Sequence, residues 1–553
     1  GQGLRPDHGL HQGWLHCVTG ATGYQGTIPR LLAAAADRDP DGTWLRSDDG
    51  LLTFAGAVGA IGRTAAALRA VGAGKGDLVM LTAATTPPYL LCWLATTALG
   101  AVAVAVNPRS SAAELAGLIR QVEPRLLVTD SSLTELIRSA RLGGDPADGD
   151  RPGVSLFPPV LDVQDIAADW TSPAAARSAT LPGADIEPDD LAVLIPTSGT
   201  TGRSKLVMQT HRAYAMAGEG FPFWMELTAA DRMMTTLPLF HVNAPAYSVM
   251  GSLACGAGLV LAGRFSASSF LDIARRHGAT EFNAIGAMLE ILMRQPERPD
   301  DADSPLRLCY TGPAPERERQ LEIERRFGLR IVVGYAMSES PYGLIWPRGS
   351  RGEARPYGTL GTIRQHPYLG VVNHARVVSE AGAVLGPGET GELELRNPVV
   401  TPGYFGMPAE TAAVMDGPWL RTGDLVTAHE DGTYTFVSRV KEVIRRRGEN
   451  LSPLEVEEVL QTHPAVLEVA VVGVPSELSE EEVKAFIVPA PAAGASVDFS
   501  SLREYAAERL AAFKVPRFWE LIDELPRTPT ARVAKHLLPA GNTPGEYDSE
   551  AAH

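Results

Sequence analysis

The chain has 553 residues, 45% of them hydrophobic and 21% charged, which is ordinary for a globular protein with a large buried core. Its 49 basic and 65 acidic residues give a formal net charge of −16, and this sign argues against a protein that binds nucleic-acid phosphates. Four scattered cysteines without a Cys-x-x-Cys spacing argue against a disulfide scaffold and a thiolate zinc site, and they fit a reducing, cytoplasmic compartment.

The first part of the chain alternates between helix-like and strand-like stretches, which is typical of layered α/β structure. Between Leu78 and Pro108 no side chain is charged, and this stretch is long enough to span a bilayer. Because Pro87, Pro88 and Gly100 divide it, we interpret it as a buried strand–helix–strand unit and predict no membrane span. The predicted elements are helices over 30–38, 54–71 and 113–122, a strand over 125–128, and the unit 78–82, 89–99 and 101–106.

The pattern then changes three times. A segment rich in proline, glycine and aspartate, 143–190, predicts surface connections, and the α/β alternation resumes at Leu191. Short strand-like runs such as 391–396 dominate 370–436 and predict a β-rich subdomain. The remainder predicts an α+β domain with strands over 441–446, 466–474 and 482–489, helices over 453–462 and 499–510, and an exposed tail from about 540.

We therefore predict an α/β protein with a large N-terminal domain, a small α+β C-terminal domain and a tail. The large domain, 1–438, contains layered α/β subdomains and the β-rich subdomain. The small, mobile domain covers 439–540, and the tail covers 541–553.

The strongest local motif is the loop from Thr197 to Lys205, Thr-Ser-Gly-Thr-Thr-Gly-Arg-Ser-Lys, which directly follows a strand-like run. Backbone amides and hydroxyl groups in such a loop bind phosphate oxygens, and the lysine offsets their charge. The spacing differs from that of a Walker motif, so the sequence predicts a polyphosphate site of another class.

Further motifs follow in a fixed order. They are Leu-Pro-Leu-Phe-His-Val-Asn at 237–243, Gly-Tyr-Ala-Met-Ser-Glu-Ser at 334–340, Leu-Arg-Thr-Gly-Asp-Leu at 420–425, Ser-Arg-Val-Lys-Glu-Val-Ile at 438–444, Gly-Glu-Asn-Leu-Ser-Pro at 448–453 and Pro-Arg-Thr at 526–528. With this ordered set the chain resembles the adenylate-forming superfamily, which contains acyl-CoA synthetases, adenylation domains of peptide synthetases and firefly luciferase. The resemblance covers about 27–538 and points to the acyl-CoA ligase branch.

The resemblance implies a role for each matched residue in binding ATP and Mg²⁺. Glu339 resembles the glutamate that binds Mg²⁺, a hard cation that prefers carboxylate oxygen. Tyr335 would stack on adenine, Asp424 would accept the ribose hydroxyls, and Arg439 would lie near the ribose and phosphates. The other residues assigned to the nucleotide are Thr197, Ser198, Gly199, Thr200, Thr201, Gly202, Lys205 and Ser338, where Ser338 replaces the usual threonine.

The acid pocket implied by the resemblance is mostly apolar. Its predicted walls are His241, Asn243, Tyr247, Gly312 and Met337, with His241 at the border of the acyl group. No cation for a second carboxylate is obvious among these residues, so the sequence favours hydrophobic acids over dicarboxylates and amino acids.

The C-terminal motif departs from the family. After 526–528 the family has two residues, then glycine and a lysine that swings into the adenylation site, whereas this chain has Ala531 and Arg532. A planar guanidinium is not equivalent to a compact ammonium. Lys535 lies three residues further on, and the sequence leaves open which of the two cations serves the reaction.

The predicted function is ATP-dependent acyl-CoA synthesis through an acyl-adenylate, with the small domain rotating about Lys441 before coenzyme A reacts. One alternative is a ligase that loads a separate carrier protein, because no carrier domain follows residue 538. A second alternative, motivated by Arg532, is a non-catalytic relative that binds nucleotide or acyl groups. The predicted partners are the acid, ATP and coenzyme A in the cytoplasm, without nucleic acid, and the oligomeric state is left open with a homodimer as one option.

Overall fold

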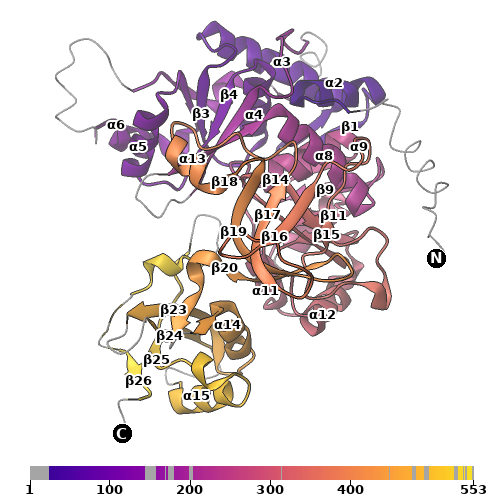
Figure 1. Ribbon diagram of the computed structural model, residues 1–553. Coiled ribbons are helices and arrows are strands. Elements are labelled where there is room, and N and C mark those ends of the chain that lie inside the picture. The colour runs from indigo at the N-terminus through magenta and orange to yellow at the C-terminus, as the bar shows by residue number, and fades with distance from the viewer. Residues whose placement is uncertain are drawn as a thin grey trace. The chain divides into compact units, whose positions relative to one another are not determined.

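The structure is a computed structural model that describes residues 24–142, 157–168, 170–171, 180–197, 204–312, 314–446, 449–475, 481–490, 497–527, 533–539, 541, 543 and 545–550. The chain forms two compact units (Figure 1). The first unit comprises Gly1–Ala375 with Leu395–Leu420, and the second comprises Arg376–Glu394 with Arg421–His553. The predicted boundary between residues 438 and 439 stays a prediction.

The first sheet of the large unit has six strands in the order β6-β5-β3-β4-β7-β8. Their bounds are β3 (Leu78–Thr82), β4 (Val102–Ala105), β5 (Leu126–Thr129), β6 (Val160–Asp162), β7 (Leu191–Thr197) and β8 (Lys205–Thr210). All neighbours pair parallel except β7 and β8, which form an antiparallel hairpin. Because β6 belongs to this sheet, the predicted surface segment 143–190 contributes structure as well as connections.

The uncharged stretch 78–108 forms a parallel strand–helix–strand unit, as predicted. Between β3 and β4 lies α4 (Pro87–Ala98), whose residues are all buried. Thr86 caps its N-terminus by accepting a hydrogen bond from the amide of Tyr89, and Pro87 fits the first turn, where no amide partner is needed. Within the described part of the chain, no helix combines the length and apolar character needed to cross a membrane.

The second sheet of the large unit has nine strands in the order β15-β14-β13-β12-β11-β9-β10-β1-β2. Their bounds are β1 (Thr43–Ser47), β2 (Gly50–Thr53), β9 (Arg232–Thr235), β10 (Gly258–Leu261), β11 (Glu281–Asn283), β12 (Leu308–Thr311), β13 (Arg330–Met337), β14 (Ser340–Ile345) and β15 (Thr362–Ile363). Strands β9, β11, β12 and β13 are parallel neighbours, so their carboxyl ends lie along one edge.

Helices accompany both sheets. Besides α4, they are α2 (Ile28–Arg38), α3 (Phe54–Ala70), α5 (Ala112–Val122), α6 (Thr134–Leu142), α7 (Val163–Ile166), α8 (His211–Met225), α9 (Met250–Cys255), α10 (Phe270–His277), α11 (Gly286–Met293), α12 (Arg317–Phe327) and α13 (Pro408–Val414). A π-helical turn, η4 (Ala244–Val249), precedes α9. The predicted helices over 30–38, 54–71 and 113–122 are therefore present.

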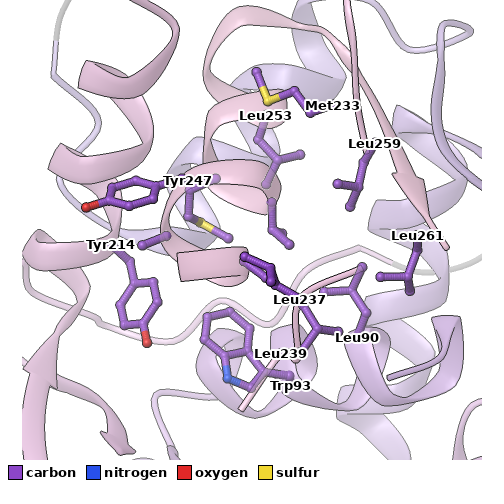
Figure 2. Packing of buried hydrophobic residues seen from close by; sticks show 14 of the residues in the cluster. Leu90, Trp93, Tyr214, Met233, Leu237, Leu239, Tyr247, Leu253, Leu259 and Leu261 are labelled. Carbon is purple, nitrogen blue, oxygen red and sulfur yellow. The ribbon is translucent and has the colours of Figure 1, made fainter. Parts of the chain in front are cut away.

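One continuous hydrophobic core joins the two sheets. Because successive side chains of a strand point to opposite faces of the sheet, only alternate residues of β3 belong to this core. Val79 and Leu81 of β3 belong to this core, whereas Met80 between them belongs to a second core with α5 on the opposite face. Figure 2 shows the first core, in which Leu90 and Trp93 of α4 lie near the side chains of Leu237 and Leu239. The core thus anchors the loop that leads to His241.

The predicted β-rich region forms a five-stranded sheet in the order β16-β17-β19-β18, with β20 paired to β19. The bounds are β16 (His374–Val378), β17 (Thr390–Arg396), β18 (Met415–Asp416), β19 (Trp419–Ala428) and β20 (Tyr434–Arg439). The C-terminal part contains β21 (Ile444–Arg446), β22 (Glu449–Leu451), α14 (Pro453–Gln461), β23 (Val466–Pro475), β24 (Glu481–Pro489), α15 (Phe499–Ala507), β25 (Phe518–Leu521) and β26 (Tyr547–Asp548).

The prediction of an exposed tail is wrong for residues 545–550. Strand β26 pairs antiparallel with β25, and the ring of Tyr547 stacks on Phe499 of α15. Glu546 forms an ion pair with the fully buried Lys484, and Asp548 forms one with Arg517. The polar sequence predicted a solvated tail because the cations that bind it, buried Lys484 and partly exposed Arg517, lie in other segments of the chain.

Glu281 of β11 is a fully buried carboxyl group in the large unit. Neither of its oxygens has a hydrogen-bond partner among the described residues. Burial raises the pKa of this carboxyl well above its usual value, Asp231 raises it further, and Arg307 opposes the shift. Glu281 is therefore protonated over a wide pH range, because ionising it would leave an unpaired charge in the core.

Replacing Glu281 by glutamine should stabilise the protein increasingly as the pH rises. Below the unfolded-state pKa of about 4.3 the carboxyl is protonated in both states, and its contribution to the free energy of unfolding is complete. As the pH rises from there toward the higher folded-state pKa, only the unfolded state ionises, and this contribution is lost. Urea denaturation at pH 5 and pH 8 measures the effect, with Glu318→Gln on the exposed face of α12 as a control. A difference in unfolding free energy that does not change with pH would contradict the assignment.

Candidate active site

The predicted phosphate loop connects the antiparallel strands β7 and β8. Thr197 lies opposite Lys205 in the register, and the hydroxyl of Thr197 donates to the Lys205 carbonyl at 3.3 Å. The ammonium of Lys205 lies 4.5 Å from the centre of the Tyr404 ring. The loop's other predicted residues lie outside the described residues: Ser198, Gly199, Thr200, Thr201 and Gly202.

Glu339 lies in the turn between β13 and β14, where contacts from two distant segments hold it. The hydroxyl of Tyr404 donates to Glu339 Oε1 at 2.9 Å, and the amide of Thr401 donates to the Glu339 carbonyl at 2.7 Å. Burial and the Glu339 carboxylate raise the pKa of Tyr404, so this phenol stays a donor. Gln209 of β8 donates to the carbonyl of Ser338 at 2.5 Å. These contacts bring the turn beside the strand that carries Lys205.

A single carboxylate beside a phosphate loop suits Mg²⁺, which takes one or two protein carboxylates and otherwise water and phosphate oxygens. Among the described residues there is no group of three or more His, Cys, Asp or Glu side chains that could hold a metal by themselves. The donor set around Glu339 therefore fits a cation that arrives with a polyphosphate.

Tyr335 of β13 is half-buried, and the β13–β14 hairpin packs tightly against it. A Cβ atom on Gly343 would lie 2.4 Å from the Tyr335 carbonyl oxygen and 3.0 Å from its ring, so only glycine fits at position 343. The phenol of Tyr335 donates to the sulfur of Met337 at 3.9 Å. Two predicted residues are thereby in contact.

The predicted acid-pocket residues are positioned at the carboxyl edge of the nine-stranded sheet, where ligands bind in open α/β sheets. His241 and Asn243 lie in the loop after β9, Gly312 follows β12, and Met337 ends β13. The imidazole of His241 lies 4.4 Å from the Phe240 ring. Tyr247 in η4 is buried and donates to the Pro341 carbonyl at 2.9 Å.

Two polar residues at this site were missed by the sequence analysis. Asn283 ends β11 and donates to the side-chain oxygen of Asn243 at 2.7 Å. Tyr404 contacts both Lys205 and Glu339. The position of Tyr404 between Gly403 and Gly406 is a sequence pattern that could have identified it. The isolated Asn283 has no such pattern.

The second unit carries the other predicted nucleotide residues. Asp424 of β19 is buried and lies directly across from Arg439 of β20, with 2.9 Å between Oδ1 and Nε. The hydroxyl of Thr422 accepts from the Asp424 amide and fixes the local backbone. This pairing orients the carboxylate.

Of the predicted hinge and C-terminal cations, only Lys535 has a described side chain. Its ammonium lies 2.7 Å from Glu457 of α14 and 3.9 Å from Glu442. Burial raises the pKa of Glu457, and Lys535 opposes that shift. Lys441 lies in the turn η7 (Val440–Glu442), with its side chain outside the described residues, and Arg532 lies outside them entirely.

Comparison with known proteins gives consistent matches. Residues 32–405 match the family of AMP-binding enzymes, and residues 455–532 match the C-terminal domain of these enzymes. The crotonobetaine/carnitine–CoA ligase of Salmonella typhimurium strain LT2 is 31% identical over 486 residues, covering 86% of this chain and 91% of that protein.

Solved structures agree. ATP-bound MatB from Rhodopseudomonas palustris has 27% identity and a TM-score of 0.79, covering 92% of this chain and 98% of that one. The AMP complex of the o-succinylbenzoate coenzyme A synthetase (MenE) from Bacillus subtilis has 27% identity, a TM-score of 0.78 and the same coverage. A fatty acyl CoA synthetase of Mycobacterium tuberculosis has 26% identity and a TM-score of 0.71, covering 93% and 97%.

The ion pair between Lys535 and Glu457 can be tested apart from any activity. Lys535→Met should lower the free energy of unfolding by about 1–3 kcal/mol, because Glu457 loses its charged partner in a largely buried position. The matched control is Lys514→Met, which removes a more exposed pair with Glu455 on the same helix and should cost under about 1 kcal/mol. Urea denaturation decides; equal effects of the two variants would refute the structural role of Lys535.

Proposed function

Because the chain belongs to the AMP-binding enzyme family, we propose that Lys205 and Glu339, joined by Tyr404, form the phosphate- and Mg²⁺-binding centre of an AMP-forming acyl-CoA synthetase. One observation carries this proposal: Tyr404 contacts both the Lys205 ammonium and the Glu339 carboxylate beside the predicted phosphate loop. The described donors fit Mg²⁺, which would neutralise phosphate charge when it arrives with ATP.

The reaction has two steps. A carboxylate oxygen of the acid attacks the α-phosphorus of ATP, and pyrophosphate leaves, giving an acyl-adenylate. The thiol of coenzyme A then attacks the acyl carbon, loses its proton, and AMP leaves. Protein groups supply position and charge rather than covalent chemistry, so orientation and electrostatic stabilisation provide most of the rate.

The first unit contributes most of the proposed contacts. Lys205 and the loop from Thr197 bind the phosphates of ATP, while Tyr335 stacks on adenine through its ring face. His241, Asn243, Tyr247, Gly312 and Met337 surround the acid. Tyr404 holds Glu339 in the orientation needed for the metal, which makes it a positioning residue.

The remaining residues in the proposal are Asp424, Arg439 and the C-terminal cation. Asp424 accepts the ribose hydroxyls, and Arg439 orients this carboxylate. We assign the adenylation cation to Arg532, because the ammonium of Lys535 is bound to Glu457. Lys441 is the proposed hinge, and its neighbour Glu442 lies in the same turn.

Coenzyme A is favoured over a carrier protein as the acceptor because the relatives reported above are coenzyme A ligases and synthetases. A cytoplasmic location is proposed because ATP, coenzyme A and reduced thiols occur there, and Cys92, Cys255 and Cys309 are free and buried. A homodimer stays a prediction.

Glu339→Gln should abolish Mg²⁺-dependent acyl-adenylate formation while the protein stays folded. The amide keeps the size of the side chain and can still accept from Tyr404, but it lacks the charge that the metal requires. Pyrophosphate exchange with ATP over a range of Mg²⁺ concentrations measures the loss, with the exposed Glu316→Gln as control. Normal exchange at low Mg²⁺ would remove Glu339 from the metal site.

Arg532→Ala should lower pyrophosphate exchange by about 10²–10³-fold, the usual loss when one preorganised donor to a developing negative charge is removed. Arg532→Lys should retain much of the activity because the charge persists. Thioester formation from presynthesised acyl-adenylate should change little in either variant. If that step falls as far as exchange does, Arg532 is not specific to adenylation.

A further inference from the structure

Arg364, directly after β15, is a fully buried guanidinium within the large unit. Its Nε donates to the Leu344 carbonyl at 2.8 Å, and its two terminal nitrogens donate to the hydroxyls of Tyr247, at 3.0 Å, and Tyr310. Three aromatic rings lie within 5.0–5.4 Å of its central carbon, those of Trp224, Tyr247 and Tyr310. The residue thus lies in a cage of ring faces and hydroxyl groups.

This guanidinium differs from the other buried ones in having no carboxylate partner among the described residues. Arg446 is buried to a similar extent, and the side chains of Arg326 and Arg355 are mostly buried; each of these three forms an ion pair with an acidic side chain. A buried charge without a counter-ion is costly, and aromatic faces offset only part of that cost. Of the five N–H groups of Arg364, three donate in the bonds above, and the other two have no acceptor among the described residues.

Arg364 borders the residues predicted to surround the acid. It binds the hydroxyl of Tyr247, and a Cβ atom on Gly334 would lie 2.5 Å from its terminal nitrogen. Gly334 in turn contacts Gly312, where a Cβ atom would lie 2.5 Å from the Gly334 carbonyl oxygen. Glycine at both positions permits the guanidinium to approach this edge of the sheet.

We propose that Arg364 binds a second carboxylate of the acid substrate, which is then a dicarboxylic acid with an apolar body between its two acid groups. The inference rests on the proposed function for the position of the reacting carboxylate. It replaces the expectation of a pocket without a cation, which arose because Arg364 is more than a hundred residues from Tyr247 in the chain. The apolar body matches the rings of Tyr247 and Phe221, which stack at 5.1 Å.

The same geometry predicts how the acid enters. Arg364 is covered by its aromatic neighbours, so the second carboxylate reaches it when a ring such as that of Tyr247 turns aside. The carboxylate then supplies the missing counter-ion and accepts the two remaining N–H groups, preferably in the bidentate arrangement that a guanidinium favours. Discrimination against acids without this group follows, because they leave the buried charge unpaired.

The test uses pairs of acids that differ only in the second carboxylate: hexanoate with hexanedioate, and benzoate with benzene-1,4-dicarboxylate. In pyrophosphate exchange, the wild-type enzyme should prefer the dicarboxylate to the matching monocarboxylate in at least one of the two pairs, by about 10- to 100-fold in kcat/KM. Arg364→Met should abolish or reverse that preference, and it should fold because apolar replacement of a buried charge is tolerated. Arg212→Met, which removes a guanidinium paired with Asp189 at the start of α8, should keep the preference.

Thermal unfolding with each acid gives a readout that needs no turnover. A dicarboxylate should raise the Tm of the wild-type protein and of Arg212→Met, but not that of Arg364→Met. If none of the acids supports pyrophosphate exchange but this Tm pattern is observed, the proposed function is refuted and the carboxylate site at Arg364 is still supported. A wild-type preference for monocarboxylates, an unchanged preference in Arg364→Met, or the absence of both exchange and Tm shifts would overturn the inference.

Discussion

The geometry of the proposed centre depends on one short segment, residues 401–405, which binds to both sheets of the large unit. Its backbone pairs with β8, where the amide of Met208 donates to the Gly403 carbonyl and that of Phe405 donates to Leu206. Its Thr401 amide and Tyr404 hydroxyl hold Glu339 in the β13–β14 turn. Lys205 and Glu339 come from different sheets, so the distance between them depends on the contacts that residues 401–405 make with β8 and with the β13–β14 turn.

The parts of the fold that the sequence predicted are those whose signal is local. The helix α4 and the strands on either side follow from continuous apolar runs broken by proline and glycine, and burial on both faces explains the absence of charge. Glu339 and Asp424 were found because each lies in a short motif. Tyr404 and Arg364 act through residues 65 and 117 positions away, and neither pattern nor propensity encodes such a pairing.

Two buried ionisable groups in the large unit illustrate opposite solutions to one problem. Glu281 has no partner among the described residues and avoids the cost of a buried charge by staying protonated. Arg364 has no such option, because a guanidinium does not lose its proton in proteins. It therefore uses hydroxyl groups and ring faces in place of an acid, and this arrangement is what suggests that a ligand completes it.

The anchoring of residues 545–550 has a consequence for how the chain is made. Lys484 is fully buried between Glu520 and Glu546, and Arg446, also buried, contacts Glu482 and Glu550. These cations lie in strands that leave the ribosome well before residues 546 and 550 do. The small unit therefore acquires these counter-ions only after residues 546 and 550 have been synthesised, so it becomes fully stable later in translation than the large unit does.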